Sequence, residues 1–306
     1  MPATDSRVFG CSFSPDGKQL ATCSGDGVRL WEVESGRALR HLPGVHGRSV
    51  AFSPDGQTLA FGNRDSEFYL WETATGLLKN NSRVRDGEVW GLMFATGKNQ
   101  LLTGAADGVQ FWNLEDLAVT GGAMVQLPVR SMVRSPDGAT LAVSESVWNM
   151  ASGIVTLRDA TTGELKTSLV RVNTSLSRVA FSPDGELLAV TQFNGEARVY
   201  SMKDGAEKLR VKAVRPQGEG VIFSQDGQYL CVFGGGNDAA AVAASRGIRL
   251  YRLTDGAEVW RNTAMADCVN AVFSPDGKLL AATDGARNVY LWQVDFAALP
   301  ARPAAK

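Results

Sequence analysis

The sequence has few of the residues on which catalytic centres depend. It holds only two histidines, His41 and His46, and these lie close together in one part of the chain. Two neighbouring histidines leave no credible Ser–His–Asp arrangement, and the GxSxG turn that carries a nucleophilic serine is absent. We therefore expect no catalytic residues and no enzymatic activity.

Residues and motifs that hold cofactors are also sparse. The four cysteines are Cys11, Cys23, Cys231 and Cys268. None has a CxxC partner and each sits in an apolar, strand-like run, which favours buried free thiols over a zinc site or a disulfide. The glycine-rich stretch 234–247 lacks the GxxxxGK[ST] spacing of a phosphate-binding loop and reads as a flexible loop. We expect no cofactor and no metal.

Neither charge of one sign nor a long hydrophobic run stands out. Lysine and arginine total 31 against 32 acidic residues, so no global field draws the protein to nucleic acid or to an anionic membrane. No apolar run of about 18 residues predicts a membrane span, and the first residues do not resemble a signal segment. A cytoplasmic location is the default expectation.

What the sequence does contain is a repeat in which a short apolar strand ends in Phe-Ser-Pro-Asp-Gly. Intact copies are Phe13 to Gly17, Phe52 to Gly56, Phe181 to Gly185 and Phe273 to Gly277. Altered copies are Phe223 to Gly227, Arg134 to Gly138 and Phe94 to Gly97. The seven copies recur every 43 residues or so, which indicates a repeat architecture.

Each repeat predicts four short strands. Proline presets the first corner of the turn, aspartate bonds its own backbone and glycine accepts a positive φ. In the first repeat a second strand, Gln19 to Cys23, leads through a Gly/Asp turn to a third strand, Val28 to Glu32. The third strands carry an aromatic residue at one fixed place: Trp31, Trp71, Trp112, Tyr200, Tyr251 or Trp292. The fourth repeat has Arg158 there instead.

Four strands per unit of about 40 to 45 residues is the pattern of a β-propeller. One such sheet cannot bury both of its faces, but seven packed radially can, because each blade covers its neighbour. We therefore predict an all-β, seven-bladed β-propeller of four-stranded antiparallel blades, with residues 1–300 as a single propeller and 301–306 as a C-terminal tail.

The combination of Phe-Ser-Pro-Asp-Gly, Leu-Trp-Glu and Thr-Gly resembles the WD-repeat family over essentially the whole chain. The resemblance implies a toroidal scaffold for protein–protein contacts, usually without catalysis. Two features depart from the family. Most blades lack the histidine of the usual His–Asp–Ser–Trp brace, so packing and turn chemistry must replace it. Few residues precede the first strand, and Pro300 disfavours a central strand at the other end, so the last blade is expected to close on itself or to be incomplete. The chain could also be one piece of a longer polypeptide.

The resemblance also implies where partners bind. Family members bind on the top face, the side formed by the loops between second and third strands and by those leading into each first strand. Residues four before each anchor Phe usually project there: Phe9, Arg48, Trp90, Arg130, Ser177, Glu219 and Val269. We predict a partner-binding site of Phe9, Arg48, Trp90, Arg130 and Glu219, with Trp148, in an insertion at 144–153, as a lateral contact.

Aromatic residues and arginine are enriched at binding hot spots, and arginine matches carboxylate and phosphate forks. The predicted partner is therefore a protein or peptide, and an acidic or phosphorylated segment would suit the arginines, although ordinary loop arginines would give the same pattern. Two alternatives remain open. One is a hydrolase- or lactonase-like propeller with a metal in its channel, for which the inner strands offer few acids. The other is a nucleic-acid platform built on the arginines and Trp90, which the near-neutral charge disfavours.

Three arginines stand where the repeat has other residues. Arg134 and Arg158 replace aromatic residues in the fourth repeat, and Arg178 replaces a glycine or serine in the fifth. Because a buried arginine needs a partner, we expect structural ion pairs, with Asp137 and Asp159 as the acids nearest in sequence.

Overall fold

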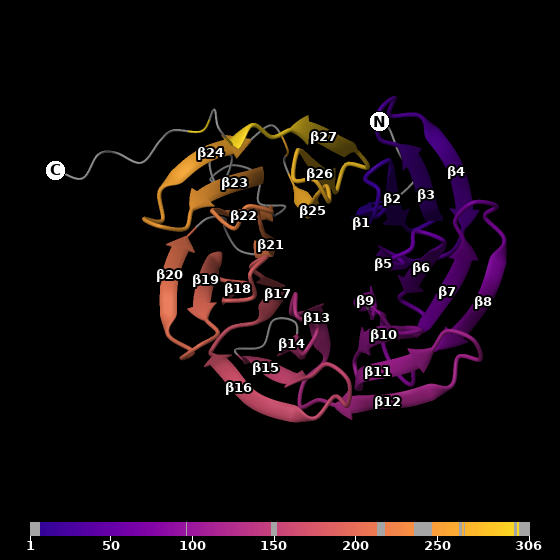
Figure 1. The fold of residues 1–306 in the computed structure, drawn as a ribbon, viewed down its shortest axis with the longest axis horizontal. Helices are drawn as coiled ribbons and strands as arrows, with labels where there is room; N and C mark the ends of the chain where they lie inside the picture. The colour runs from indigo at the N-terminus through magenta and orange to yellow at the C-terminus, as the bar shows by residue number, and fades with distance from the viewer. Residues whose placement is uncertain are drawn as a thin grey trace.

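The computed structural model describes residues 7–95, 97–147, 152–212, 218–235, 247–262, 265, 267–296 and 299, without the side chains of 218 and 219. These residues form seven antiparallel sheets arranged as a ring (Figure 1). The prediction of an all-β, seven-bladed propeller is confirmed. None of the elements in this part of the chain is a helix with the length and apolarity needed to traverse a bilayer.

The first four blades follow one another along the chain. Blade one comprises β1 (Val8–Phe13), β2 (Gln19–Ser24), β3 (Gly27–Glu32) and β4 (Ala38–Pro43). Blade two comprises β5 (Gly47–Phe52), β6 (Thr58–Asn63), β7 (Glu67–Glu72) and β8 (Leu78–Arg83). Blade three comprises β9 (Gly91–Phe94), β10 (Gln100–Ala105), β11 (Gly108–Asn113) and β12 (Val119–Met124). Blade four comprises β13 (Val129–Arg134), β14 (Thr140–Ser146), β15 (Gly153–Asp159) and β16 (Leu165–Val172).

The remaining three blades complete the ring. Blade five comprises β17 (Leu176–Phe181), β18 (Leu187–Gln192), β19 (Glu196–Ser201) and β20 (Glu207–Lys212). Blade six comprises β21 (Gly218–Phe223), β22 (Tyr229–Gly234), β23 (Gly247–Arg252) and β24 (Glu258–Asn262). Blade seven comprises β25 (Cys268–Phe273), β26 (Leu279–Asp284) and β27 (Val289–Gln293).

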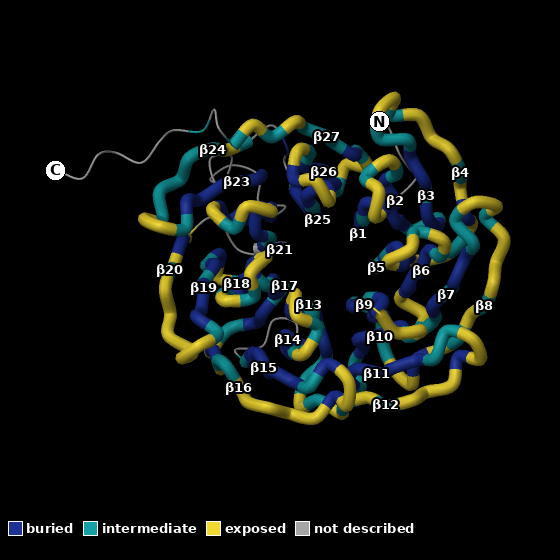
Figure 2. The backbone as a smooth tube through the Cα atoms, in the orientation of Figure 1, coloured by how far each residue is buried: buried dark blue, intermediate teal, exposed yellow. Residues whose placement is uncertain are grey.

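Burial follows the order of strands within each blade. The first strands line the centre of the ring and the fourth strands form its rim, where Figure 2 shows most of the exposed backbone. Second strands are almost wholly buried between neighbouring blades, and third strands are mostly buried, as in the all-buried β22 and β23. In β27 only one residue of five is buried. The core is therefore a series of apolar layers between blades, which is the arrangement expected when no blade can cover its own faces.

The Ser-Pro-Asp-Gly turns join the first and second strands through side-chain hydrogen bonds. In blade one the Ser14 hydroxyl donates to Asp16 at 2.6 Å, and the amide of Gln19 donates back to the Ser14 hydroxyl at 2.9 Å. Gly17 has a φ of 71°, which glycine adopts without strain. The hydrogen bond from Ser14, followed by that from the backbone of Lys18, lowers the pKa of the Asp16 carboxyl. The turn thus favours the ionised form of Asp16.

In blades one and three, the tryptophan at the fixed place of the third strand donates a hydrogen bond to the second strand. Trp31 donates from Nε1 to Thr22 Oγ1 at 2.9 Å, and Trp112 makes the equivalent bond to Thr103 at 2.9 Å. Both indoles are buried, at 4% exposure. A tryptophan–threonine bond across adjacent strands therefore serves these blades, while the exposed His41 contacts the carbonyl of Asp26 instead of bracing an indole.

Blade four has Arg158 at the place of the aromatic residue, and its charge is paired with a buried carboxylate. Arg158 lies in the core, where Nη2 is 3.5 Å from the fully buried carboxylate of Glu145 and Nη1 donates to the Gly163 carbonyl at 3.2 Å. Thr156 donates to the same carboxylate at 2.6 Å. The expected ion pair exists, but the prediction that Asp159 would supply the carboxylate is wrong.

Arg134 also differs from expectation, because it donates from Nε to the carbonyl of Gly138 at 2.8 Å and makes no described ion pair with Asp137. The physical reason is the same in both places. The carboxylates nearest in sequence are engaged by their own turns: Asp137 accepts from Ser135 at 2.5 Å, and Asp159 accepts from the backbone amide of Thr161 at 2.8 Å.

The ring closes without a fourth strand on blade seven in the described residues. Thr283 of β26 donates to the carbonyl of Val8 at 3.2 Å, and apolar residues of blades one and seven share one core cluster. After β27 the chain packs Phe296 against Tyr229 of blade six, with ring centroids 5.2 Å apart, and against Phe273 at 5.9 Å. Of the two expectations for the last blade, the described residues agree with the incomplete one.

Candidate binding site on the top face

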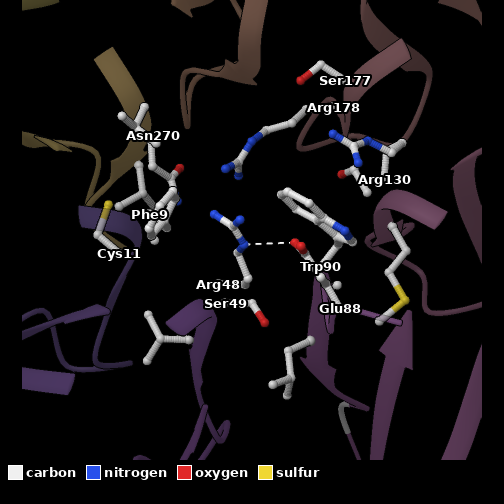
Figure 3. A pocket seen from close by; sticks show the side chains of 18 of the residues that line it. Phe9, Cys11, Arg48, Ser49, Glu88, Trp90, Arg130, Ser177, Arg178 and Asn270 are labelled. Atoms are coloured by element: carbon white, nitrogen blue, oxygen red, sulfur yellow. Dashed lines mark hydrogen bonds and ion pairs between the residues drawn. The ribbon is translucent and has the colours of Figure 1, made fainter. Parts of the chain in front are cut away.

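The top face opens into a cavity at the centre of the ring. Its volume is about 890 Å³ (Figure 3). Its walls come from the first strands, from the loops that lead into them, and from Arg64 and Ala106 in loops between second and third strands. Each first strand begins at the top face and ends below it, in six blades at a Ser-Pro-Asp-Gly-type turn, so equivalent residues of the blades converge here. The geometry of the repeat thus places the residues four before six of the seven anchors around a single opening.

Aromatic rings and guanidinium groups alternate along one wall of the cavity. The Arg48 Cζ atom lies 4.2 Å from the ring centroid of Phe9 and 4.8 Å from that of Trp90. Arg130 covers Trp90 with its Cζ 4.3 Å from the ring centroid. Each contact of this kind is worth about 0.5–2 kcal/mol, depending on how far it is removed from water. We call this row of four residues the cation–π stack.

Glu88 fixes the arginine at the centre of the cation–π stack. Its carboxylate accepts from Arg48 Nε at 2.9 Å and from Arg64 Nε at 3.0 Å. The Arg48 side chain is only 9% exposed, and burial lowers its pKa, with the positive charge of Arg64 adding to the effect and Glu88 opposing it. Because arginine remains charged at any ordinary pH, the result is a cation held rigidly in partly dry surroundings.

Arg178 reaches into the same cavity from blade five. Its guanidinium points toward that of Arg48 across the opening (Figure 3). Sequence reasoning grouped Arg178 with the structural ion pairs and did not place it in the site. One signal could have found it: the position three before the anchor is Arg in this blade alone, against Gly10, Ser49, Gly91, Ser131, Gly220 and Asn270 in the others.

A neighbouring glycine makes room for Arg178. A Cβ atom added to Gly220 of blade six would lie 2.8 Å from Arg178 Cδ and 2.3 Å from Phe233 Cζ. Both distances are shorter than real contacts, so any larger residue would displace the arginine or the ring. The path of Arg178 into the cavity therefore depends on the absence of a side chain on the next blade.

The described residues of the cavity wall carry a surplus of positive charge. Five arginines line it, and Glu88 is the one acid among the residues that form its wall. The arginines are Arg7, Arg48, Arg64, Arg130 and Arg178. Arg7 also pairs with Asp267, at 3.1 Å between Nη2 and Oδ2. An anion is the ligand that such a wall favours.

The described wall of the cavity has one thiol, that of Cys11, and no histidine. Cys11 lies in the wall, but burial raises the pKa of its thiol to about 12, far above the range in which a thiolate nucleophile forms. Within the part of the chain that the structure describes, no three histidine, cysteine or acidic side chains gather where a metal ion could be held.

The structure brings four of the six predicted site residues together. Phe9, Arg48, Trp90 and Arg130 form the cation–π stack. Glu219 belongs to β21, with its side chain outside the described residues, and Trp148 also lies outside them. Arg7, Arg64, Glu88 and Arg178 also line the cavity and were not among the predicted site residues.

These observations define a class: a seven-bladed β-propeller with an arginine- and aromatic-lined cavity on its top face. Comparison with known proteins agrees with the assignment to the β-propellers. The family model "WD domain, G-beta repeat" matches residues 1–32 and 262–293, and the model described as "Outer membrane protein assembly factor BamB" matches residues 18–232. The chain belongs to the WD-repeat β-propeller family, and residues 18–232 also fall within the second family.

Curated relatives share part of their length with this chain. U3 small nucleolar RNA-associated protein 12 of Saccharomyces cerevisiae is 30% identical over 160 residues, which covers 46% of this chain and 17% of that protein. Echinoderm microtubule-associated protein-like 2 of Homo sapiens is 25% identical over 324 residues, covering 95% of this chain and 48% of that protein. WD repeat-containing protein SL1-17 of Schistosoma mansoni is 28% identical, covering 51% of each. The chain thus spans about half or less of each of these relatives.

Among solved structures, a chain of Kuenenia stuttgartiensis hydrazine synthase superposes with a TM-score of 0.83, covering 95% of this chain and 97% of that chain. The sequences are 18% identical, so the likeness extends to the fold.

Proposed function

We propose that this propeller is a non-catalytic interaction scaffold that captures an acidic segment of a partner protein in its top-face cavity. The observation that carries the proposal is the cation–π stack, which combines aromatic surface with fixed positive charge at the centre of the ring. Such centrally placed, partly buried aromatic and arginine residues are the type that dominates binding energy in protein interfaces. Membership of the WD-repeat family supports the same role.

The stacking arrangement favours a peptide over a nucleic acid. Nucleobases bind by stacking on exposed aromatic faces. Here Arg48 covers the rings of Phe9 and Trp90, and Arg130 also covers Trp90. The rings therefore orient guanidinium groups, whose N–H edges suit the oxygens of an anion. The net charge of −1 also lacks the basic surplus typical of nucleic-acid binders.

The test is capture of partners by matched variants. The immobilised wild-type chain is compared with Arg130→Gln, which removes the outermost cation of the stack, and with Arg37→Gln, which removes one charge from an exposed turn between β3 and β4 on the opposite face. Partners are identified by quantitative mass spectrometry, and acidic segments are then tested as synthetic peptides. We expect partners that Arg130→Gln loses and Arg37→Gln keeps. An identical set from all three proteins would refute the top-face site.

A further inference from the structure

The cavity has features that a general affinity for acidic chains does not require. Arg48 and Arg178 come from blades two and five and face each other across the opening (Figure 3). Arg48 is fixed by two rings and by Glu88, and Arg178 occupies space that Gly220 leaves open. The two guanidinium groups therefore point from opposite walls toward one central position.

The charge of the wall indicates how much negative charge that position takes. Five arginines line the cavity against Glu88. If Asp267, which pairs with Arg7, is set against the arginines together with Glu88, an excess of three positive charges remains among the described residues. A single carboxylate supplies one negative charge, whereas a phosphate monoester supplies about 1.5 to 2 at neutral pH. The dianion therefore offsets more of this positive excess than a carboxylate does.

The shape of the anion also favours a phosphate monoester over a carboxylate. A carboxylate is planar and offers its two oxygens to one fork at a time. A phosphate monoester has three terminal oxygens arranged around phosphorus, so it can accept from forks on opposite sides at once. Because only 9% of the Arg48 side chain is exposed, a dianion bound to it would meet less competition from water than at the protein surface.

We propose that Arg48 and Arg178 together hold a phosphate monoester carried on a side chain of the partner protein. The inference rests on the proposed function and specifies the group at its centre. Phe9, Trp90 and Glu88 position Arg48, and Arg130 and Arg64 add to the positive field without forming the central pair.

The experiment uses the full chain and three immobilised degenerate peptide libraries that share flanking sequences and have phosphoserine, glutamate or serine at the fixed centre. We expect retention on the phosphoserine library to exceed the other two by about tenfold or more, because a charge-assisted hydrogen bond is worth about one to two factors of ten in affinity. Arg48→Gln and Arg178→Gln should each reduce retention by a similar factor. Arg48→Lys, which keeps the charge but loses the fork, should fall between wild type and Arg48→Gln. Arg37→Gln is the matched control, and circular dichroism verifies that each variant is folded.

The outcomes separate this inference from the proposed function. Equal retention of the glutamate and phosphoserine libraries would overturn the phosphate assignment while leaving acidic-segment capture intact. Binding of inorganic phosphate, detected by phosphorus NMR line broadening, without selective retention of the phosphoserine library would show that the source is a free phosphate and would overturn the partner side chain. Retention of the phosphoserine library that Arg48→Gln and Arg178→Gln leave unchanged would overturn the central pair.

Discussion

The buried pair in blade four gives the sharpest test of how this propeller is stabilised. Glu145 is fully buried and Arg158 is 7% exposed, so neither charge is compensated by water. In Glu145→Gln the amide oxygen can still accept from Thr156, but Arg158 keeps its charge with only the Gly163 carbonyl and the Thr156 hydroxyl beside it. Breaking a buried ion pair from one side costs about 3–5 kcal/mol, because an uncompensated charge remains.

Replacing both partners should behave differently. In the double variant Glu145→Leu with Arg158→Leu no charge is left in the core, and apolar replacements of buried pairs are often neutral or stabilising by about 1–4 kcal/mol. Urea unfolding followed by tryptophan fluorescence gives the change in the free energy of unfolding for each variant. We expect a large loss for the single substitution and recovery in the double. A loss below about 1 kcal/mol for Glu145→Gln would refute the reasoning, since it would mean that water or another group compensates Arg158.

Three further predictions concern the core and the turns. Phe296→Ala should lower the free energy of unfolding by about 1–2 kcal/mol in urea titrations, because the half-buried ring bridges blades six and seven. Gly220→Ala should cost about 1–3 kcal/mol by the same assay, because its Cβ would meet Phe233 Cζ at 2.3 Å; an unchanged midpoint would count against the tight fit. The pKa of Asp16, like those of four of its counterparts in the other Ser-Pro-Asp-Gly-type turns, lies below the ordinary 3.8, chiefly through the serine hydroxyl bond. A depressed folded pKa contributes stability above pH 3.8 that is lost as the pH falls through the folded value, so thermal melts should show the loss below that pH, and less of it in Asp16→Asn.

Much of the fold was predictable because each repeat contains its own turn chemistry. The third strand expected at Val28 to Glu32 is β3, which begins one residue earlier at Gly27. The residues four before six of the seven anchors converge because the first strands begin at the same face, so one local rule fixes a spatial arrangement. That rule, taken from the family resemblance, placed Phe9, Arg48 and Trp90 in one cavity.

The contacts that sequence reasoning missed are those made across blades or across hairpins. Glu145 and Arg158 are 13 residues apart, and the β14–β15 hairpin brings them together while the nearer Asp159 is held by its own turn. The direction of Arg178 depends on the size of residue 220 in the next blade. Neither relation has a fixed spacing in the chain, so no repeat pattern could reveal it.

The way the site breaks the symmetry of the ring bears on how a partner chain would lie. Seven identical blades would offer seven equivalent positions around the opening, and a bound segment would have no preferred direction. Large side chains stand four before the anchor in blades one to four, whereas blades five and seven have Ser177 and Val269. We therefore expect an extended segment to cross the edge of the cavity over blades five and seven and to present its anionic group toward the cation–π stack. Ser177→Trp would narrow that side without altering any cation, so it should weaken capture of a long peptide while leaving the binding of inorganic phosphate unchanged. Equal loss of both would mean that the segment approaches from elsewhere.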